Sequence, residues 1–122
     1  MKKLINGDAY IALQGKGELI LNTILSGIKI NYENYYTNVE LSFIKKENDN
    51  LPSIIINMKK IKFFDFVYGE DIYYIVDYKI IFEDNKYYLS LDPYNSTNNI
   101  SDSDGGIVIS EFIEIIFLDP QI

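Results

Sequence analysis

Residues 72–91 read IYYIVDYKIIFEDNKYYLSL, and this stretch decides the fold. Large apolar residues occupy every second position from Ile72 to Phe82, which is the period-two pattern of a half-buried strand. Glu83–Lys86 follows, and its central Asp and Asn tolerate the left-handed backbone of a tight turn. The alternation resumes over Tyr87–Leu91. The sequence therefore predicts an antiparallel hairpin.

The charges and the apolar residues of this hairpin agree on one register. With the turn centred between Asp84 and Asn85, opposite charges meet beside the turn and apolar residues meet on one face. A slip of one residue destroys that agreement. The predicted pairs are Glu83 with Lys86, Phe82 with Tyr87, Ile80 with Leu89, and Tyr78 with Leu91.

Three other segments favour strands through alternation or β-branched residues: 39–43, 54–63 and 107–118. Polar Ser110, Glu111 and Glu114 interrupt the last segment, which predicts a bulge or an edge position there.

The first 30 residues allow two interpretations. In one, Ala9–Gln14 and Glu18–Leu25 are strands of a hairpin around Gly15-Lys16-Gly17. In the other, which we favour, residues 18–26 form a short helix that ends at Gly27 and covers one face of the sheet. The overall prediction is a single mainly β domain over residues 1–122. It is an antiparallel sheet or sandwich of about six to eight strands with at most one short N-terminal helix.

Composition removes several classes of function. The chain has no Cys and no His, which excludes disulfides and thiolate nucleophiles and removes the commonest general base and metal ligand. A net charge of −7 argues against nucleic-acid binding and suits a basic protein partner. No apolar run approaches the roughly 18 residues of a membrane span, and the apolar stretch at the N-terminus stops at Asn6-Gly7-Asp8, short of the ~7–15 apolar residues of a signal peptide. We expect a cytoplasmic, non-enzymatic protein without a cofactor.

The polar loop 95–106 partly matches a calcium-binding loop. Asp102, Asp104 and Glu111 fall at ligand positions of an EF-hand pattern that begins at Ile100. Ile100 cannot coordinate calcium, and the flanking segments favour strands, so we expect no metal site and a solvated turn instead.

Paired carboxylates raise the alternative of a carboxylate-dependent hydrolase. Glu111 and Glu114 lie in an apolar stretch, where burial could raise the pKa of one of them. Residues three apart on a strand point to opposite faces, however, which favours a solvent-facing or edge role for these charges.

Adjacent aromatic residues recur in the expected strands, as at 63–64, 73–74 and 87–88. Neighbouring strand residues point to opposite faces, so one ring of each pair cannot enter the same core. If Phe63, Tyr74 and Tyr87 point inward, the others form a second aromatic face, either covered by another layer or exposed to a partner. The expected partner-binding residues are Phe64, Asp65, Glu70, Tyr73, Asp77, Tyr88 and Asp92.

Tyr87–Tyr94 followed by Ile100–Gly106 resembles the C-terminal half of small uncharacterised bacterial proteins, some of which are similar to immunity proteins of polymorphic toxin systems. The resemblance covers about a third of the chain and includes no functional motif. It implies a small, acidic, non-catalytic protein that neutralises a toxin domain, such as a nuclease, by binding it. The main alternative is a self-assembling structural subunit of bacterial or phage origin, so a homo-oligomer remains open.

Overall fold

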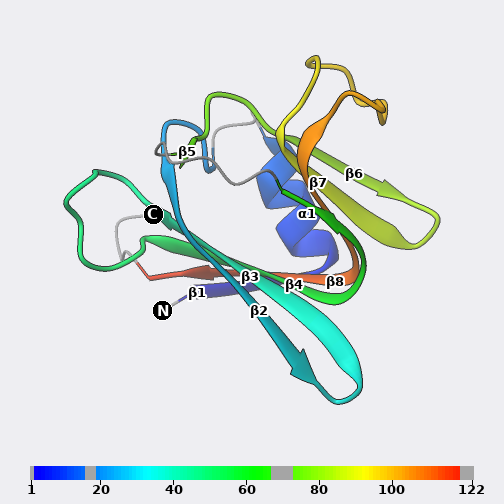
Figure 1. Ribbon diagram of the computed structural model, residues 1–122, viewed down its shortest axis with the longest axis horizontal. Helices are drawn as coiled ribbons and strands as arrows, with labels where there is room; N and C mark the ends of the chain where they lie inside the picture. The colour runs from blue at the N-terminus through cyan, green and yellow to red at the C-terminus, as the bar shows by residue number, and fades with distance from the viewer. Residues whose placement is uncertain (1, 16–18, 67–72, 119–122) are drawn as a thin grey trace.

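The computed structural model describes residues 2–15, 19–66 and 73–118 of the chain (Figure 1). All of the strands pair in antiparallel fashion in a single curled sheet of order β5-β2-β3-β4-β8-β7-β6, and β1 pairs with β8 beside this path. The mainly β fold class and the single short N-terminal helix are thus confirmed. The elements are β1 (Lys2–Ile5), α1 (Gly7–Gln14), β2 (Ile24–Glu33), β3 (Tyr36–Ile44), β4 (Ile54–Asp65), β5 (Tyr73–Tyr74), β6 (Lys79–Glu83), β7 (Lys86–Asp92) and β8 (Gly105–Phe117).

The β6–β7 hairpin has the predicted register near its turn. Glu83 lies opposite Lys86, Phe82 opposite Tyr87 and Ile80 opposite Leu89. Asp84 and Asn85 have φ angles of 53° and 60°, as both central residues of a type I′ turn require.

The predicted strand Ile72–Phe82 is wrong in its first half. Residue 72 lies outside the described residues, and Tyr73–Tyr74 form β5, which pairs with β2 rather than with β7. Ile75 then leaves the ladder, since its backbone bonds to Asn22 and Thr23, and β6 begins only at Lys79. The pairing of Tyr78 with Leu91 is therefore not part of the hairpin, whose ladder ends at Lys79 and Ser90.

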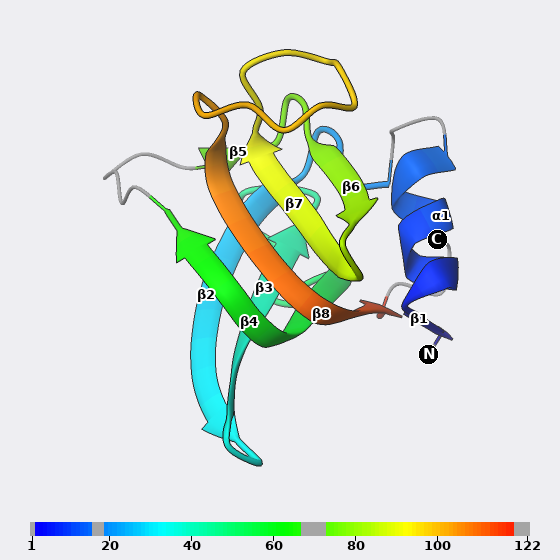
Figure 2. The same cartoon turned by 90° about the vertical axis from the view of Figure 1, so that its right-hand side faces the viewer.

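The helix covers a face of the sheet as expected, but it lies at Gly7–Gln14 instead of residues 18–26. A helix over residues 18–26 is wrong because Asn22 adopts a left-handed φ of 62° and Ile24 already pairs with strands on both sides. Ala9–Gln14 is likewise not a strand. Ala9 and Leu13, four residues apart, are buried against the sheet. Figure 2 shows α1 beside β6 and β1, where it closes the open side of the curl.

β8 is an interior strand with partners on both sides, so the predicted edge position is wrong. β4 runs along one side of it, while β7 and then β1 run along the other. The register shift in the β4–β8 ladder lies between Ile61 and Phe63 of β4. It decides which ring of the 63–64 pair enters the core: Phe64 packs against the core, whereas Phe63 is exposed.

The main core lies on the inner face of the curl. A row of directly opposed residues crosses four strands there, namely Phe64, Val108, Leu89 and Ile80. The central strands β3 and β4 contribute further fully buried residues, which are Leu41, Phe43, Ile56 and Met58. Burial of this continuous apolar surface is the main source of stability for the sheet.

Candidate functional site

The outer face of the sheet carries a second, smaller apolar cluster. Phe63, Ile109, Tyr88 and Ile81 lie directly opposite one another on β4, β8, β7 and β6. Ile81, Tyr88 and Ile107 are buried, and Ile109 is partly buried against them. Since this cluster is on the far side of the sheet from the main core, a different part of the chain must cover it.

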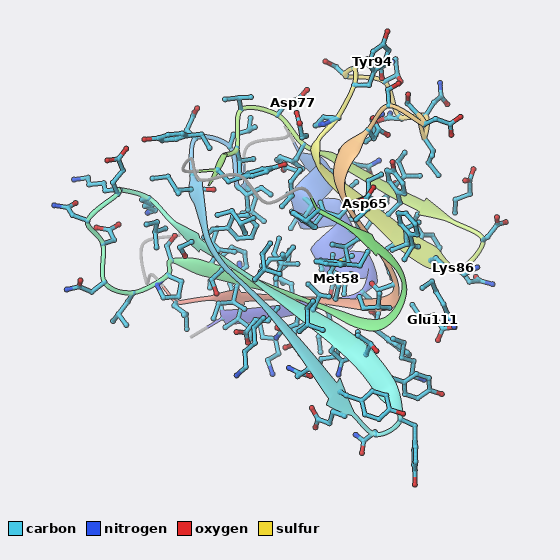
Figure 3. The ribbon with its side chains drawn as sticks, in the orientation of Figure 1. Met58, Asp65, Asp77, Lys86, Tyr94 and Glu111 are labelled. Carbon is cyan, nitrogen blue, oxygen red and sulfur yellow. The ribbon has the colours of Figure 1, made fainter. Side chains whose placement is uncertain are left out.

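Residues 93–104 provide that cover. This segment rises from the end of β7 and returns as β8 (Figure 2), Tyr94 lies on it (Figure 3), and its Asp104 carboxylate accepts a hydrogen bond from Tyr88 of the outer cluster. Ser90 Oγ donates a hydrogen bond of 2.7 Å to the Gly105 carbonyl at its base.

A buried ion pair holds the loop in place. Lys79 on β6 is 4 % exposed and Asp104 at the end of the loop is 6 % exposed. Lys79 Nζ donates to both carboxylate oxygens of Asp104, at 3.1 and 3.2 Å, and to the Asn99 carbonyl at 2.7 Å. The ammonium group therefore joins the outer face of β6 to two points of the loop.

The carboxylate of Asp104 has three further donors. Tyr88 Oη donates at 2.7 Å, the Tyr94 N–H at 2.9 Å and the Ser101 N–H at 3.0 Å. Burial by itself raises the pKa of the Asp104 carboxyl, but these hydrogen bonds and Lys79 outweigh it and lower the pKa to about 2. Burial and the Asp104 carboxylate raise the pKa of the Tyr88 hydroxyl. The network is thus an ionised carboxylate with its donors in place at neutral pH.

Sequence reasoning missed this network. The alternating pattern predicted that Lys79 points to the face opposite to Ile80, and the structure confirms this, since Ile80 lies in the main core. The available signal was a single lysine in an apolar strand, because a charged side chain is almost never fully buried without a partner. Asp104 lies 25 residues away in a loop rich in Asp, Asn and Ser, so nothing local identified it as that partner.

A groove of about 310 Å³ opens between the loop of residues 93–104 and the end of β4. Phe63 and Ile100, each 47 % exposed, together with Ile107 and Ile109 give it an apolar surface. The exposed carboxylates of Asp65 and Asp102 line the same groove from β4 and from the loop. Asp65 is labelled in Figure 3 at the end of β4. Such a surface can hold an apolar stem and a positively charged head group together.

The predicted partner-binding residues do not form one surface. Asp65 lines the groove, and Tyr88 lies beneath it, only 4 % exposed. Asp77 instead lines a second pocket of about 200 Å³ beside the end of α1, and Asp92 is exposed at the end of β7. Glu70 lies outside the described residues.

The expected inward and outward assignment of the aromatic pairs is correct only for the pair Tyr87 and Tyr88, which lie in the main core and in the outer cluster respectively. Phe64 and Tyr73 pack against the main core on either side of Phe66, with ring-centroid distances of 5.1 and 6.4 Å. Burial, with a contribution from Asp92, raises the pKa of Tyr73 to about 12. Phe63 and Tyr74 are exposed, because the shift in β4 and the separation of β5 from β6 change which face each residue occupies.

The residues of the partial calcium pattern have separate partners. Asp104 is held by Lys79, Glu111 lies 3.3 Å from Lys62 Nζ, and Asp102 is exposed at the groove. Within the described part of the chain, no three acidic side chains gather as a metal site.

Glu111 and Glu114 also have different surroundings. Glu114 accepts a hydrogen bond of 3.0 Å from Asn57 and lies 3.6 and 3.7 Å from the ammonium groups of Lys3 and Lys59. Partial burial acts to raise its pKa, but these partners lower it overall. A general acid of a hydrolase needs a raised pKa, which Glu114 and Asp104 both lack.

No helix in the described residues is long and apolar enough to cross a membrane. No protein-family model, curated protein or solved structure matches the chain.

Proposed function

We propose that the chain is a non-catalytic intracellular inhibitor of the immunity type, which binds a basic protein such as a nuclease toxin. The observation that carries the proposal is the groove, an apolar surface that carries Asp65 from the end of β4 and Asp102 from a loop held by a buried ion pair. A fixed loop lowers the conformational entropy lost on binding, so its contacts contribute more to affinity.

The chemistry of the groove suits an arginine or lysine of the partner. The aliphatic part of such a side chain can lie on Phe63, Ile100 and Ile109, while its charged group reaches the two carboxylates. The net charge of −7 adds long-range attraction, which accelerates association with a basic surface and weakens as salt is added.

The test is capture of partners from a lysate of the source organism with the tagged chain at low and high salt. We expect a basic protein that is held at low salt and released at high salt. The purified partner must then lose its own enzymatic activity when mixed with the chain at equal molarity. Retention that is indifferent to salt, or binding that leaves the partner's activity intact, contradicts the proposal.

A pair of charge-matched variants locates the contact. Asp65→Asn/Asp102→Asn removes both carboxylates of the groove and should weaken binding at least about tenfold. Glu83→Gln/Asp84→Asn removes the same charge at the exposed β6–β7 turn and should change affinity by less than about twofold. Equal losses in the two variants contradict binding at the groove, since they would show that only net charge matters.

A further inference from the structure

The β2–β3 hairpin forms an arm that projects beyond the rest of the molecule in both ribbon views (Figures 1 and 2). β3 covers one edge of β2 along its whole length. On the other edge, β5 pairs only with Ile24 and Leu25. Among the described residues, no strand pairs with that edge from Ser26 to Glu33, so within this part of the chain it is an unpaired sheet edge.

The register of the hairpin determines which backbone groups face outward. Asn34 and Tyr35, with φ angles of 53° and 69°, form a two-residue type I′ turn, so Glu33 and Tyr36 are the hydrogen-bonded pair beside it. Because bonded and non-bonded pairs alternate in an antiparallel ladder, Ile30 and Tyr32 direct their N–H and C=O groups away from β3.

The side chains of this edge are apolar on one face and charged on the other. Ile30 and Tyr32 are 53 % and 70 % exposed on the face that continues the core. Lys29 and Glu33, of opposite sign, point to the other face. Exposed sheet edges are commonly blunted by proline, by bulges or by repelling charges, and from Ile28 to Glu33 this edge has neither a proline nor a register shift.

We propose that β2 pairs antiparallel with β2 of a second copy of this chain, on a two-fold axis at Asn31. In that register, the outward-facing Ile30 of one copy lies opposite Tyr32 of the other, so the exposed backbone groups bond to each other. Lys29 then lies opposite Glu33 across the axis. Each pair occurs twice, so the same four residues of each copy form the contacts on both the apolar and the charged face, as a two-fold contact requires.

A copy of the same chain fits this edge better than an unrelated partner, because the edge is complementary to itself. The charges of Lys29 and Glu33 cancel at this edge, whereas the groove between β4 and the loop before β8 carries the two carboxylates of Asp65 and Asp102. The inference is independent of the proposed inhibitor function, because Asp65 and Asp102 take no part in the edge contact.

Sedimentation velocity over a concentration series tests the proposal. We expect a reversible dimer of the wild-type chain. Glu33→Lys sets lysines against each other twice and should raise the dimer dissociation constant about tenfold. The exchange Lys29→Glu/Glu33→Lys restores both attractive pairs and should return the constant to within about twofold of wild type. Glu83→Lys makes the same charge change away from the edge and should have no effect.

A backbone variant tests the hydrogen bonds themselves. Ile30→Pro removes an N–H that faces the second copy and leaves the β2–β3 ladder its donors, so the chain should remain folded by circular dichroism but become monomeric. A wild-type chain that is monomeric at every concentration overturns the proposal. So does a dimer that Glu33→Lys leaves unchanged, or one that the charge exchange fails to restore. The proposal is also overturned if the wild-type chain is a monomer and Ile30→Pro abolishes binding of the basic protein captured from the lysate. That result would assign the β2 edge to the captured protein.

Discussion

The substitution Lys79→Met removes the cation that holds the loop over the outer face. Met keeps most of the length of the apolar stem, so the change mainly deletes the ammonium group and leaves little cavity. The Asp104 carboxylate would then be buried at 6 % exposure with Tyr88 Oη, the Tyr94 N–H and the Ser101 N–H as its donors.

The expected loss follows from those remaining contacts. Removing one partner of a buried ion pair costs about 3–5 kcal/mol, because the other charge is left without compensation. Three surviving donors stabilise the Asp104 carboxylate, so we expect the lower end, about 3 kcal/mol of unfolding free energy. This is a large fraction of the roughly 5–15 kcal/mol of a typical domain, but it leaves the chain folded.

Urea unfolding at pH 7, followed by far-ultraviolet circular dichroism, measures the loss. The fluorescence of the 11 tyrosines is the second probe, since the chain has no Trp. Lys59→Met is the matched control: Lys59 is an exposed lysine 3.7 Å from Glu114, and its removal should cost less than about 1 kcal/mol. The double variant Lys79→Met/Asp104→Asn should lose at least about 1.5 kcal/mol less than the sum of the two single losses.

Two results would refute this reasoning. One is a loss below about 1 kcal/mol for Lys79→Met, which would place the pair in the range of solvent-exposed ion pairs. The other is additivity of the two single variants within about 0.5 kcal/mol, which would show that the charges do not stabilise each other.

Three further predictions concern backbone conformation and pH. Tyr35→Gly should stabilise the chain by about 1 kcal/mol in thermal or urea unfolding, because Tyr35 has a left-handed φ of 69°. Asn85→Gly in the other type I′ turn should gain less stability, since Asn tolerates that conformation. Equal gains in stability for the two variants would contradict this. Gly106→Ala should lower the unfolding free energy by about 1–2 kcal/mol, because φ is +57° and the new Cβ would lie 2.7 Å from the Tyr73 hydroxyl. Gly15→Ala should leave it unchanged, since Gly15 has a φ of −65° and open space around it. Similar losses for the two variants would argue against backbone strain at Gly106. The pKa of Asp104 is about 2 in the folded chain against an ordinary 3.8. Its carboxylate therefore contributes about 2 kcal/mol to the unfolding free energy above pH 4, and this contribution is lost as pH falls toward 2. A wild-type chain whose unfolding free energy stays constant over that range contradicts the prediction.

The candidate site was only partly predictable from the sequence. Asp65 was expected at a binding surface and lines the groove, because a carboxylate at the end of an apolar strand is exposed in most arrangements. Tyr88 was expected on that surface but is buried below it. The attachment of the loop after β7 to the outer face depends on Lys79 and Asp104, which are 25 residues apart and form no local pattern.

The sequence by itself determined the features that depend on neighbouring residues. Alternation and the Asp84–Asn85 turn set the register of the β6–β7 hairpin, because a turn of this type admits one pairing. Composition determined a mainly β chain without Cys or His chemistry. Only the tertiary structure decided which ring of each aromatic pair is buried. A period of two defines two faces but not which face is covered, and that choice depends on a register shift in β4 and on contacts between distant parts of the chain.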